Sequence, residues 1–262
     1  MCAINGFNFP DRELILKMKK FTSNRGPDAE GLYIDSNITI YHNRLSILDL
    51  NKNADQPMSY KNYIISFNGE IYNYRELRSS LIKFGYKFKT NSDTEVILHL
   101  FDKYNIEAFK KLSGIFAISI WDKFEKKLYL IRDTVGVKPL YYLKDNLTNK
   151  FFFSSSINSL LLNLKEKQIN KSIFNYYSNL GRNDNNETIF KGIFKLMPGQ
   201  LLILHNNSIE ITNYLKFVFS YKEKDEDEIK QIISDTIKKQ LVSDVPTSLA
   251  LSGGVDSNVV YS

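Results

Sequence analysis

The sequence has little of several features that mark secreted, membrane and metal-binding proteins. Cysteine occurs once among 262 residues, so an internal disulfide is excluded and no cluster of zinc ligands can be recognised. No apolar run approaches the roughly 18–20 residues that a membrane-spanning helix needs. No basic segment followed by an apolar stretch opens the chain, so no secretory signal is expected. We therefore expect a cytoplasmic protein without a metal site and without a membrane partner.

The excess of positive charge, a formal +6, is spread along the sequence and is not concentrated in one segment. Hydrophobic residues make up 43% and charged residues 24% of the chain, which are ordinary values for a globular protein. The lysines are scattered and accompany no nucleic-acid-binding motif, so no nucleic-acid partner is expected.

Periodicity predicts mixed strands and helices in the first hundred residues. The third predicted helix opens with Ser92 as its cap and Glu95 three residues later, a capping box. In the first, Leu14, Met18 and Phe21 share one face. The predicted strands are 2–8, 31–35, 38–45 and 63–67, and the predicted helices are 11–23, 72–84 and 93–104.

Successive strands dominate the next hundred residues, at 115–122, 127–132, 140–144, 151–154 and 201–205. Short helices fit 156–163 and 172–180. Strands for two sheets, with helices on either side in the sequence, predict an α+β fold in which two sheets face each other and helices lie outside.

A second unit is expected to begin after a linker near 215–224. Residues 225–241 form an amphipathic pattern with Ile229, Ile232, Ile233 and Ile237 inward. Residues 245–251 predict a buried strand that runs into the loop Ser252–Ser257. Because a complete α/β domain does not fit in the remainder, we expect domains at 1–215 and 216–262, the second incomplete in a fragment or truncated protein.

Cys2 is a candidate nucleophile. If Met1 is removed, the α-amine of Cys2 has a pKa of about 7.7–8 and can accept the thiol proton, directly or through one water. The thiolate can then attack a carbonyl. By itself, a cysteine near the start of a chain is most often coincidence.

The segment 67–73 offers groups that such a nucleophile needs. The Asn68 side-chain amide and the Gly69 backbone N–H could stabilise an oxyanion. Arg44, at a strand end, suits an α-carboxylate. Asp93, with Glu70, suits an α-ammonium. Each has an ordinary alternative: a turn for Asn-Gly, a surface arginine for Arg44, and a first-turn acid for Asp93.

Several short motifs occur in one order that makes coincidence untenable. In this combination the chain resembles the class II glutamine amidotransferases, whose glutaminase domain is an N-terminal nucleophile hydrolase. The segment SDVPTSLALSGGVDS at 243–257 narrows the resemblance to glutamine-dependent asparagine synthetases. The other motifs are MCAINGF, NRGPD, HNRLSILD, FNGEIYNY, SDTEV, RDTVGVKPLYY and MPGQ.

The resemblance implies a four-layer α/β/β/α sandwich at 1–215, followed by the start of an α/β adenine-nucleotide-binding domain. It implies that Cys2 forms a thioester with L-glutamine and releases ammonia, which needs no cofactor, while Asn68 and Gly69 form the oxyanion hole. The implied glutamine-binding residues are Arg44, Leu45, Ser46, Ile47, Leu48, Asn68, Gly69, Glu70 and Asp93.

The resemblance also implies that a complete synthetase domain uses ATP with Mg²⁺ to adenylate L-aspartate for attack by ammonia. The loop would hold the pyrophosphate through backbone N–H groups, and it lacks the lysine of a Walker A loop. A homodimer, or a separate chain that supplies the missing domain, is a possible partner. The implied ATP-binding residues are Leu251, Ser252, Gly253, Gly254, Val255, Asp256 and Ser257.

The chain departs from the family pattern at several positions. Asn24 replaces a usual histidine and Asn43 a usual glutamate, and Gln200 replaces a histidine after Pro-Gly. A usual Ser-Glu pair followed by a basic residue is replaced by uncharged side chains at Ser155, Ser156 and Asn158, which bears on contacts between the two domains.

Two alternatives remain open. The acceptor of the ammonia could be a sugar or peptide carboxylate instead of aspartate, because the acceptor-binding residues lie outside this sequence. The chain could also be a catalytically silent fragment, which retention of Met1 would favour. None of the three histidines is assigned a catalytic role.

Overall fold

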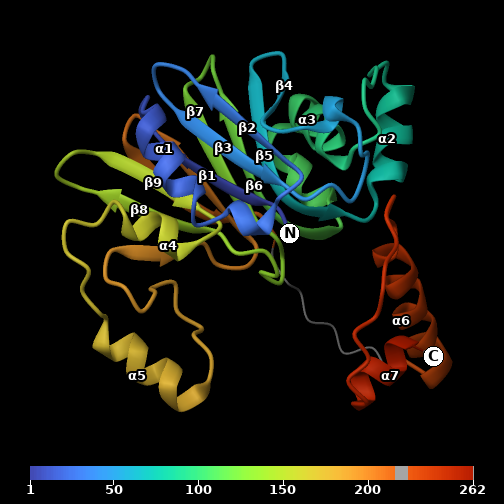
Figure 1. The fold of residues 1–262 in the computed structure, drawn as a ribbon. Coiled ribbons are helices and arrows are strands. Elements are labelled where there is room, and N and C mark those ends of the chain that lie inside the picture. Colours follow the sequence, from blue (N-terminus) through green and yellow to red (C-terminus); the bar gives the residue numbers. More distant parts are fainter. Residues whose placement is uncertain (216–223, 262) are drawn as a thin grey trace.

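Two antiparallel sheets stacked face to face form the body of the molecule (Figure 1). The computed structural model describes residues 1–215 and 224–261. The first sheet contains, in spatial order, β10 (Ile193–Lys195), β8 (Tyr141–Asp145), β9 (Lys150–Ser154), β1 (Ala3–Phe7), β3 (Thr39–Arg44) and β2 (Ala29–Ile34). The second contains β12 (Ser208–Asn213), β11 (Gln200–His205), β7 (Lys127–Arg132), β6 (Gly114–Asp122), β5 (Tyr63–Ile71) and β4 (Met58–Tyr60).

Alternation along the strands sends every second side chain into the space between the sheets. Ile4 and Phe153 from the first sheet meet Ile64 and Leu130 from the second in one buried cluster. The opposite faces are covered by helices, because each sheet is apolar on both sides. α1 (Arg12–Lys19) and α4 (Ile157–Leu161) cover the first sheet, and α2 (Tyr74–Lys83) and α3 (Asp93–Tyr104) cover the second. The predicted α/β/β/α sandwich is confirmed.

The described helices follow local capping signals. Ser92 accepts a hydrogen bond from the Glu95 backbone N–H at the start of α3, which is one half of the predicted capping box. The other half is absent, because the Glu95 carboxylate accepts from the N–H groups of Lys89 and Thr90, while the Ser92 N–H donates to the Thr90 hydroxyl. Asp11 caps α1 as Ser92 caps α3. The first helix is shorter than predicted: it ends at Lys19, so Ile15 and Met18 are its buried side chains and Phe21 is exposed.

Four strands depart from the sequence expectation. β4 and β10 were not predicted, since strands of three residues carry little alternation, and the six-residue edge strand β12 was also not predicted. β5 continues to Ile71 instead of ending near residue 67. The Asn68–Glu70 segment therefore lies within a strand, paired with β6, and is not a turn.

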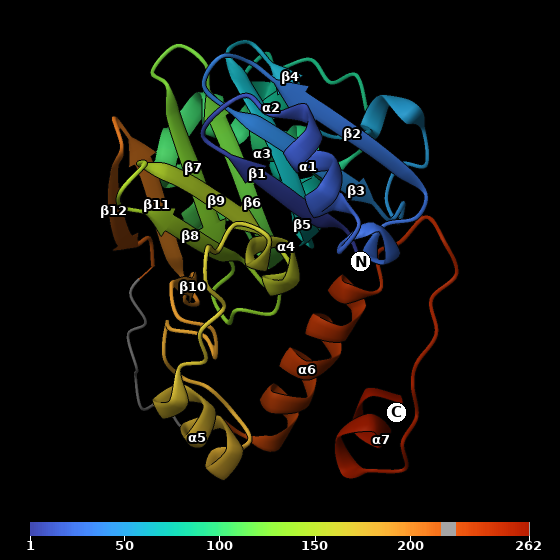
Figure 2. The same ribbon diagram turned by 60° about the vertical axis from the view of Figure 1, so that its left-hand side comes forward.

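The C-terminal part of the chain reaches the sandwich at Val242, which packs against its core, whereas both views show α7 (Val255–Tyr261) standing off it (Figure 2). α5 (Lys171–Leu180) also projects away. The expected linker falls mainly on residues 216–223, outside the described residues. None of the described helices is long and apolar enough to cross a bilayer.

The predicted helix near 225–241 is observed as α6 (Glu226–Gln240), with Asp225 as its cap. Its isoleucines were predicted to be buried, and this is wrong: Ile229 is 46% and Ile232 45% exposed. Ile233 and Ile237 face α7 across an open groove.

The predicted buried strand at 245–251 is also wrong. A strand needs backbone partners, and no described strand lies beside this segment, in which Leu249 and Leu251 are 44% and 53% exposed.

The layer between the sheets should carry much of the stability. We predict that Leu130→Ala lowers the free energy of unfolding by about 2–5 kcal/mol, because Leu130 is fully buried there and its truncation leaves a cavity. Urea unfolding measures the change. Leu147→Ala is the matched control: Leu147 is 85% exposed, and its loss should change the free energy by less than about 0.5 kcal/mol. Equal effects of the two substitutions would contradict this assignment of the core.

Candidate active site

Cys2 lies immediately before β1, a central strand of the first sheet, and its sulfur points into a pocket. The Leu45 backbone N–H donates to Sγ at 3.3 Å, and Sγ lies 3.6 Å from the Leu45 carbonyl oxygen. Burial raises the pKa of the thiol, and the Leu45 contact acts in the opposite direction. While Met1 is attached, the nitrogen of Cys2 is a peptide nitrogen. The terminal amine then belongs to Met1, and burial lowers its pKa.

The end of β5 presents one backbone N–H that the sheet does not use. The N–H and C=O of Phe116 both bond to Asp133, so Phe116 and its cross-strand neighbour Gly69 form a non-hydrogen-bonded pair. The Gly69 N–H therefore faces away from β6, as do those of Phe67 and Ile71. Side chains of Gln56 and Asp93 accept from these two, at 2.6 and 3.0 Å. The Gly69 N–H between them has no hydrogen-bond partner among the described residues.

Asn68 and Gly69 differ from their neighbours in ways that suit an oxyanion hole. Asn68 is 1% exposed, yet neither polar atom of its side chain has a partner in the described structure. Such a group is costly unless a ligand or water satisfies it. Position 69 must be glycine, because a Cβ would lie 2.1 Å from the Ile115 carbonyl oxygen.

Two carboxyl groups, those of Glu70 and Asp93, also line the pocket. Asp93 opens α3 and is buried, and burial together with the nearby charge of Glu70 raises its pKa to about 7. Burial also raises the pKa of Glu70. A cationic group between them would favour ionisation of both, so the pair is suited to an ammonium ligand.

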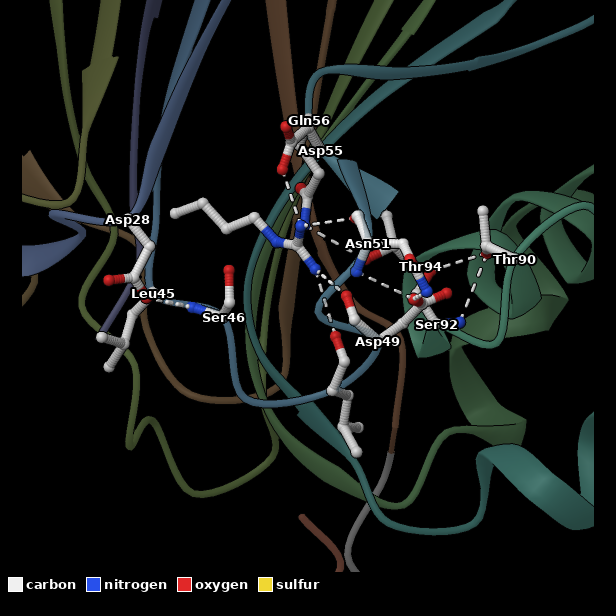
Figure 3. A network of polar contacts seen from close by, with 12 residues as sticks. Asp28, Leu45, Ser46, Asp49, Asn51, Asp55, Gln56, Thr90, Ser92 and Thr94 are labelled. Atoms are coloured by element: carbon white, nitrogen blue, oxygen red, sulfur yellow. Dashed lines mark hydrogen bonds and ion pairs between the residues drawn. The ribbon is translucent and has the colours of Figure 1, made fainter. Parts of the chain in front are cut away.

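Arg44 ends β3 and is buried under the loop that follows it. Figure 3 shows Asp49, Asn51 and Asp55 of this loop gathered in one network of polar contacts. Nη1 donates to the Asp55 carboxylate at 2.6 Å and to the Asn51 carbonyl at 3.1 Å. Nη2 donates to the carbonyls of Leu48 and Asp49. Both terminal nitrogens therefore hold the loop, and a bidentate grip on a substrate carboxylate would have to replace some of these bonds. That role of Arg44 stays a prediction.

The same loop is bound by the start of the C-terminal segment. The Asp244 carboxylate accepts from the Asp49 N–H at 2.7 Å, and the Asp244 N–H donates to the Ile47 carbonyl at 2.9 Å. The Asp49 side chain in turn accepts from Asn51 and from the Asn91 N–H. Asp244 thus connects the pocket wall to a segment that precedes the Ser252–Ser257 loop by eight residues.

One pocket brings together nearly all the predicted glutaminase residues. Ser46 is the exception: its N–H donates to the Asp28 carboxylate at 2.7 Å, and it does not line the pocket. The pocket also includes residues that the sequence reasoning did not assign, namely Lys138, Gln56, Ser92 and Thr94. It is lined by Met1, Cys2, Arg44, Leu45, Ile47, Leu48, Ala54, Gln56, Phe67, Asn68, Gly69, Glu70, Ser92, Asp93, Thr94 and Lys138.

Only some of the missed residues left a signal in the sequence. Lys138 lies in the motif at 132–142, whose presence was noted without a role for the lysine. Gln56 had no signal. Its side chain bridges β5 and α3 by accepting from the Phe67 N–H and donating to the Thr94 hydroxyl at 3.1 Å.

The histidines have no catalytic geometry in the pocket. His42 is fully buried, and burial lowers its pKa to about 3, so the neutral ring donates Nε2–H to the Phe67 carbonyl at 3.0 Å. It links the two sheets next to Asn68. His99 packs edge-on against Tyr60 and Phe88.

Several of the residues that depart from the family pattern take part in hydrogen bonds between uncharged groups. The Asn43 side chain accepts from the Thr22 hydroxyl, which accepts from Asn5, so the position of a usual glutamate belongs to a buried neutral network. Ser155 accepts from the Ile4 N–H, beside Cys2 in the chain. The Gln200 side chain accepts from the Met197 N–H and closes the turn before β11.

The Ser252–Ser257 loop lies outside this pocket. It exposes hydroxyl groups and backbone at a bend where Gly253 has a φ of +78°, and its last three residues form the start of α7. Such donors fit phosphate oxygens. No group of three or more His, Cys, Asp or Glu side chains in the described chain is placed to hold a metal ion.

Comparison with known proteins identifies the family to which the chain belongs. The glutamine amidotransferase domain family matches residues 1–215. The chain belongs to this family. The asparagine synthase family matches residues 228–262. The predicted resemblance is thereby confirmed.

The relatives are longer than this chain. It is 38% identical to asparagine synthetase (glutamine-hydrolyzing) 1 of Bacillus subtilis over 257 residues, which cover 95% of this chain and 40% of that protein. It is 37% identical to a putative asparagine synthetase (glutamine-hydrolyzing) 2 of Methanocaldococcus jannaschii, covering 99% of this chain and 56% of the relative. The chain therefore spans about half the length of these relatives.

A solved structure shows the same fold. Glutamine phosphoribosylpyrophosphate amidotransferase of B. subtilis aligns with a TM-score of 0.62 at 16% identity, over 83% of this chain and 50% of the other. Since the identity is low, this similarity bears on the fold of the amidotransferase domain alone.

The contact between Asp244 and the pocket loop can be tested directly. We predict that Asp244→Ala increases the exchange rate of the Asp49 backbone amide at least about tenfold, because the N–H loses a charged acceptor. Hydrogen exchange followed by nuclear magnetic resonance measures this rate. Asp256→Ala is the matched control, since the exposed Asp256 side chain makes no hydrogen bond to the described chain. An unchanged rate at Asp49 would remove Asp244 from the loop.

Proposed function

We propose that the chain is the glutaminase portion of a glutamine-hydrolysing asparagine synthetase. The observation that carries the proposal is the pocket in which the only cysteine accompanies an unpaired Asn68 side chain and a free Gly69 N–H. The family supplies glutamine as the substrate class. Glu70 and Asp93 bind its α-ammonium, and Arg44 and its loop lie where they can bind the α-carboxylate.

The reaction follows from these groups. After removal of Met1, the α-amine of Cys2 accepts the thiol proton and the thiolate attacks the side-chain amide carbon. Asn68 and Gly69 donate hydrogen bonds to the resulting oxyanion, each worth about 2.7–4 kcal/mol. The proton held by the amine passes to the leaving nitrogen, so ammonia departs and a glutamyl thioester remains. Water then attacks the thioester and releases glutamate.

The use of the ammonia is the second part of the proposal. Relatives named asparagine synthetases support ATP-dependent, AMP-forming amidation of L-aspartate in a complete protein. The residues Leu251–Ser257 would contact the ATP phosphates, with Mg²⁺ as counter-ion. A 31% identical relative from Gibberella zeae is named Amidase chry2, so not all relatives carry the asparagine synthetase name. Another carboxylate acceptor, such as a sugar or peptide, is the alternative.

The nucleophile gives the decisive test. We predict that Cys2→Ala abolishes glutamate release from glutamine, a loss of at least about a thousandfold in kcat, since no other described group in the pocket can form the thioester. A coupled glutamate assay measures turnover, and mass spectrometry of the intact protein establishes whether Met1 is removed. Full activity in Cys2→Ala would reject the proposal. A processed, folded wild-type protein without turnover would favour the catalytically silent alternative.

The carboxyl pair predicts a pH dependence of substrate binding. The pKa of Asp93 is raised to about 7, so its ionised, ammonium-binding form is lost as the pH falls. We predict that KM for glutamine is level above pH 7.5 and rises toward about tenfold per pH unit below pH 6.5. Asp93→Asn should have a high KM that no longer varies in this range. A wild-type KM that is constant from pH 6 to 8 would show that Asp93 does not bind the ammonium.

A further inference from the structure

A buried lysine lies in the pocket without a partner. Lys138 is 7% exposed and lines the pocket together with Cys2 and Glu70. Its ammonium group makes no hydrogen bond or ion pair with any residue that the structure describes. Holding an ammonium on a largely buried side chain without an ion-pair partner is unfavourable, so a fold rarely keeps one without a reason.

The backbone of Lys138 is fixed from both sides. Its N–H donates to the Asp133 carboxylate at 3.0 Å, and its carbonyl accepts from Arg132 Nε at 2.8 Å. Arg132 also donates to the Gly136 carbonyl, and Asp133 accepts from the Val137 N–H at 2.9 Å. Two buried charged side chains therefore shape the turn that directs Lys138 into the pocket, which is a specific placement.

The surroundings show which groups the lysine charge acts on. It interacts electrostatically with Glu70 and Cys2, then with Arg25 and Asp133, and with the terminal amine of Met1. Burial lowers the pKa of Lys138, and Glu70 and Cys2 oppose this. The charged groups that face Cys2 and Lys138 in the described structure are Arg25, Asp28, Arg44, Glu70, Asp93 and Asp133.

We propose that Lys138 is a positioning residue that acts through Cys2: its positive charge favours the thiolate over the thiol and the neutral over the protonated terminal amine. The role in catalysis rests on the proposed glutaminase function, while the effect on the thiol does not. Arg44 contributes in the same direction as Lys138 but is occupied by its loop, and Asp93 acts in the opposite direction. The Lys138 ammonium, by contrast, makes no hydrogen bond or ion pair within the described chain and lines the pocket beside Cys2.

Removal of the charge should shift the pH at which Cys2 reacts. We predict that Lys138→Met moves the pH profile of Cys2 alkylation by iodoacetamide upward by about one unit, so that alkylation at pH 7 is about tenfold slower. Lys138→Arg should stay within about threefold of wild type, because it retains the charge. The experiment uses the complete 262-residue chain, and mass spectrometry identifies the modified residue, which is the only cysteine.

Two controls separate the charge effect from loss of structure and from failure of the proposed function. Lys123→Met removes the same charge from an exposed position outside the pocket and should leave the profile unchanged. Lys138→Gln gives the profile if Lys138→Met does not fold. Alkylation needs no glutamine turnover, so it tests the lysine even if the chain is inactive. A Lys138→Met profile that overlaps wild type, or an equal shift in Lys138→Arg, would overturn the proposal.

Discussion

The candidate site depends on where β5 loses its neighbour. β4 pairs with β5 only as far as Met58 and Ile65, so the backbone of β5 beyond that point has one side unpaired by the sheet. Gln56 and Asp93 then satisfy the N–H groups of Phe67 and Ile71 on either side of Gly69. In the described structure this leaves the Gly69 N–H as a single free donor between two N–H groups that are already hydrogen-bonded. Its direction is set by the register of the β5–β6 ladder, not by a flexible loop, which is the kind of preorganisation that transition-state stabilisation requires.

The loop on the other side of the pocket is held by the buried side chain of Arg44. Arg44 ties four carbonyl or carboxylate oxygens of the 48–55 segment to the end of β3. Leu45, next in the chain, contacts the Cys2 sulfur through its own backbone. Cys2 and the loop are therefore positioned by the same strand end. In the layer behind them Asn43 and Ser155 have uncharged partners, whereas the pocket itself holds the charged side chains of Arg44, Glu70, Asp93 and Lys138.

Motif order in the sequence predicted the fold and most of the pocket: Cys2 directly precedes β1, Asn68, Gly69 and Glu70 lie in the last part of β5, and Asp93 is the first residue of α3. Gln56 could not be predicted, since its importance arises from two contacts across the fold. Lys138 lay in a noted motif, but only its burial without a partner distinguishes it from the chain's other lysines. The predicted burial of α6 and of residues 245–251 failed for a different reason. Apolar periodicity reports that a segment has a face to bury, but says nothing of whether the described chain provides the partner.

The bond between Asp49 and Asp244 has a consequence for any attempt to separate the two units. A cut placed after residue 215, where the amidotransferase family match ends, would keep every strand of the sandwich. It would also remove the acceptor of the Asp49 N–H and the donor to the Ile47 carbonyl. The boundary of the secondary structure is therefore not the boundary of the hydrogen-bonded unit. An isolated amidotransferase half that keeps the loop of Ile47 and Asp49 in place would have to carry the peptide that reaches Asp244.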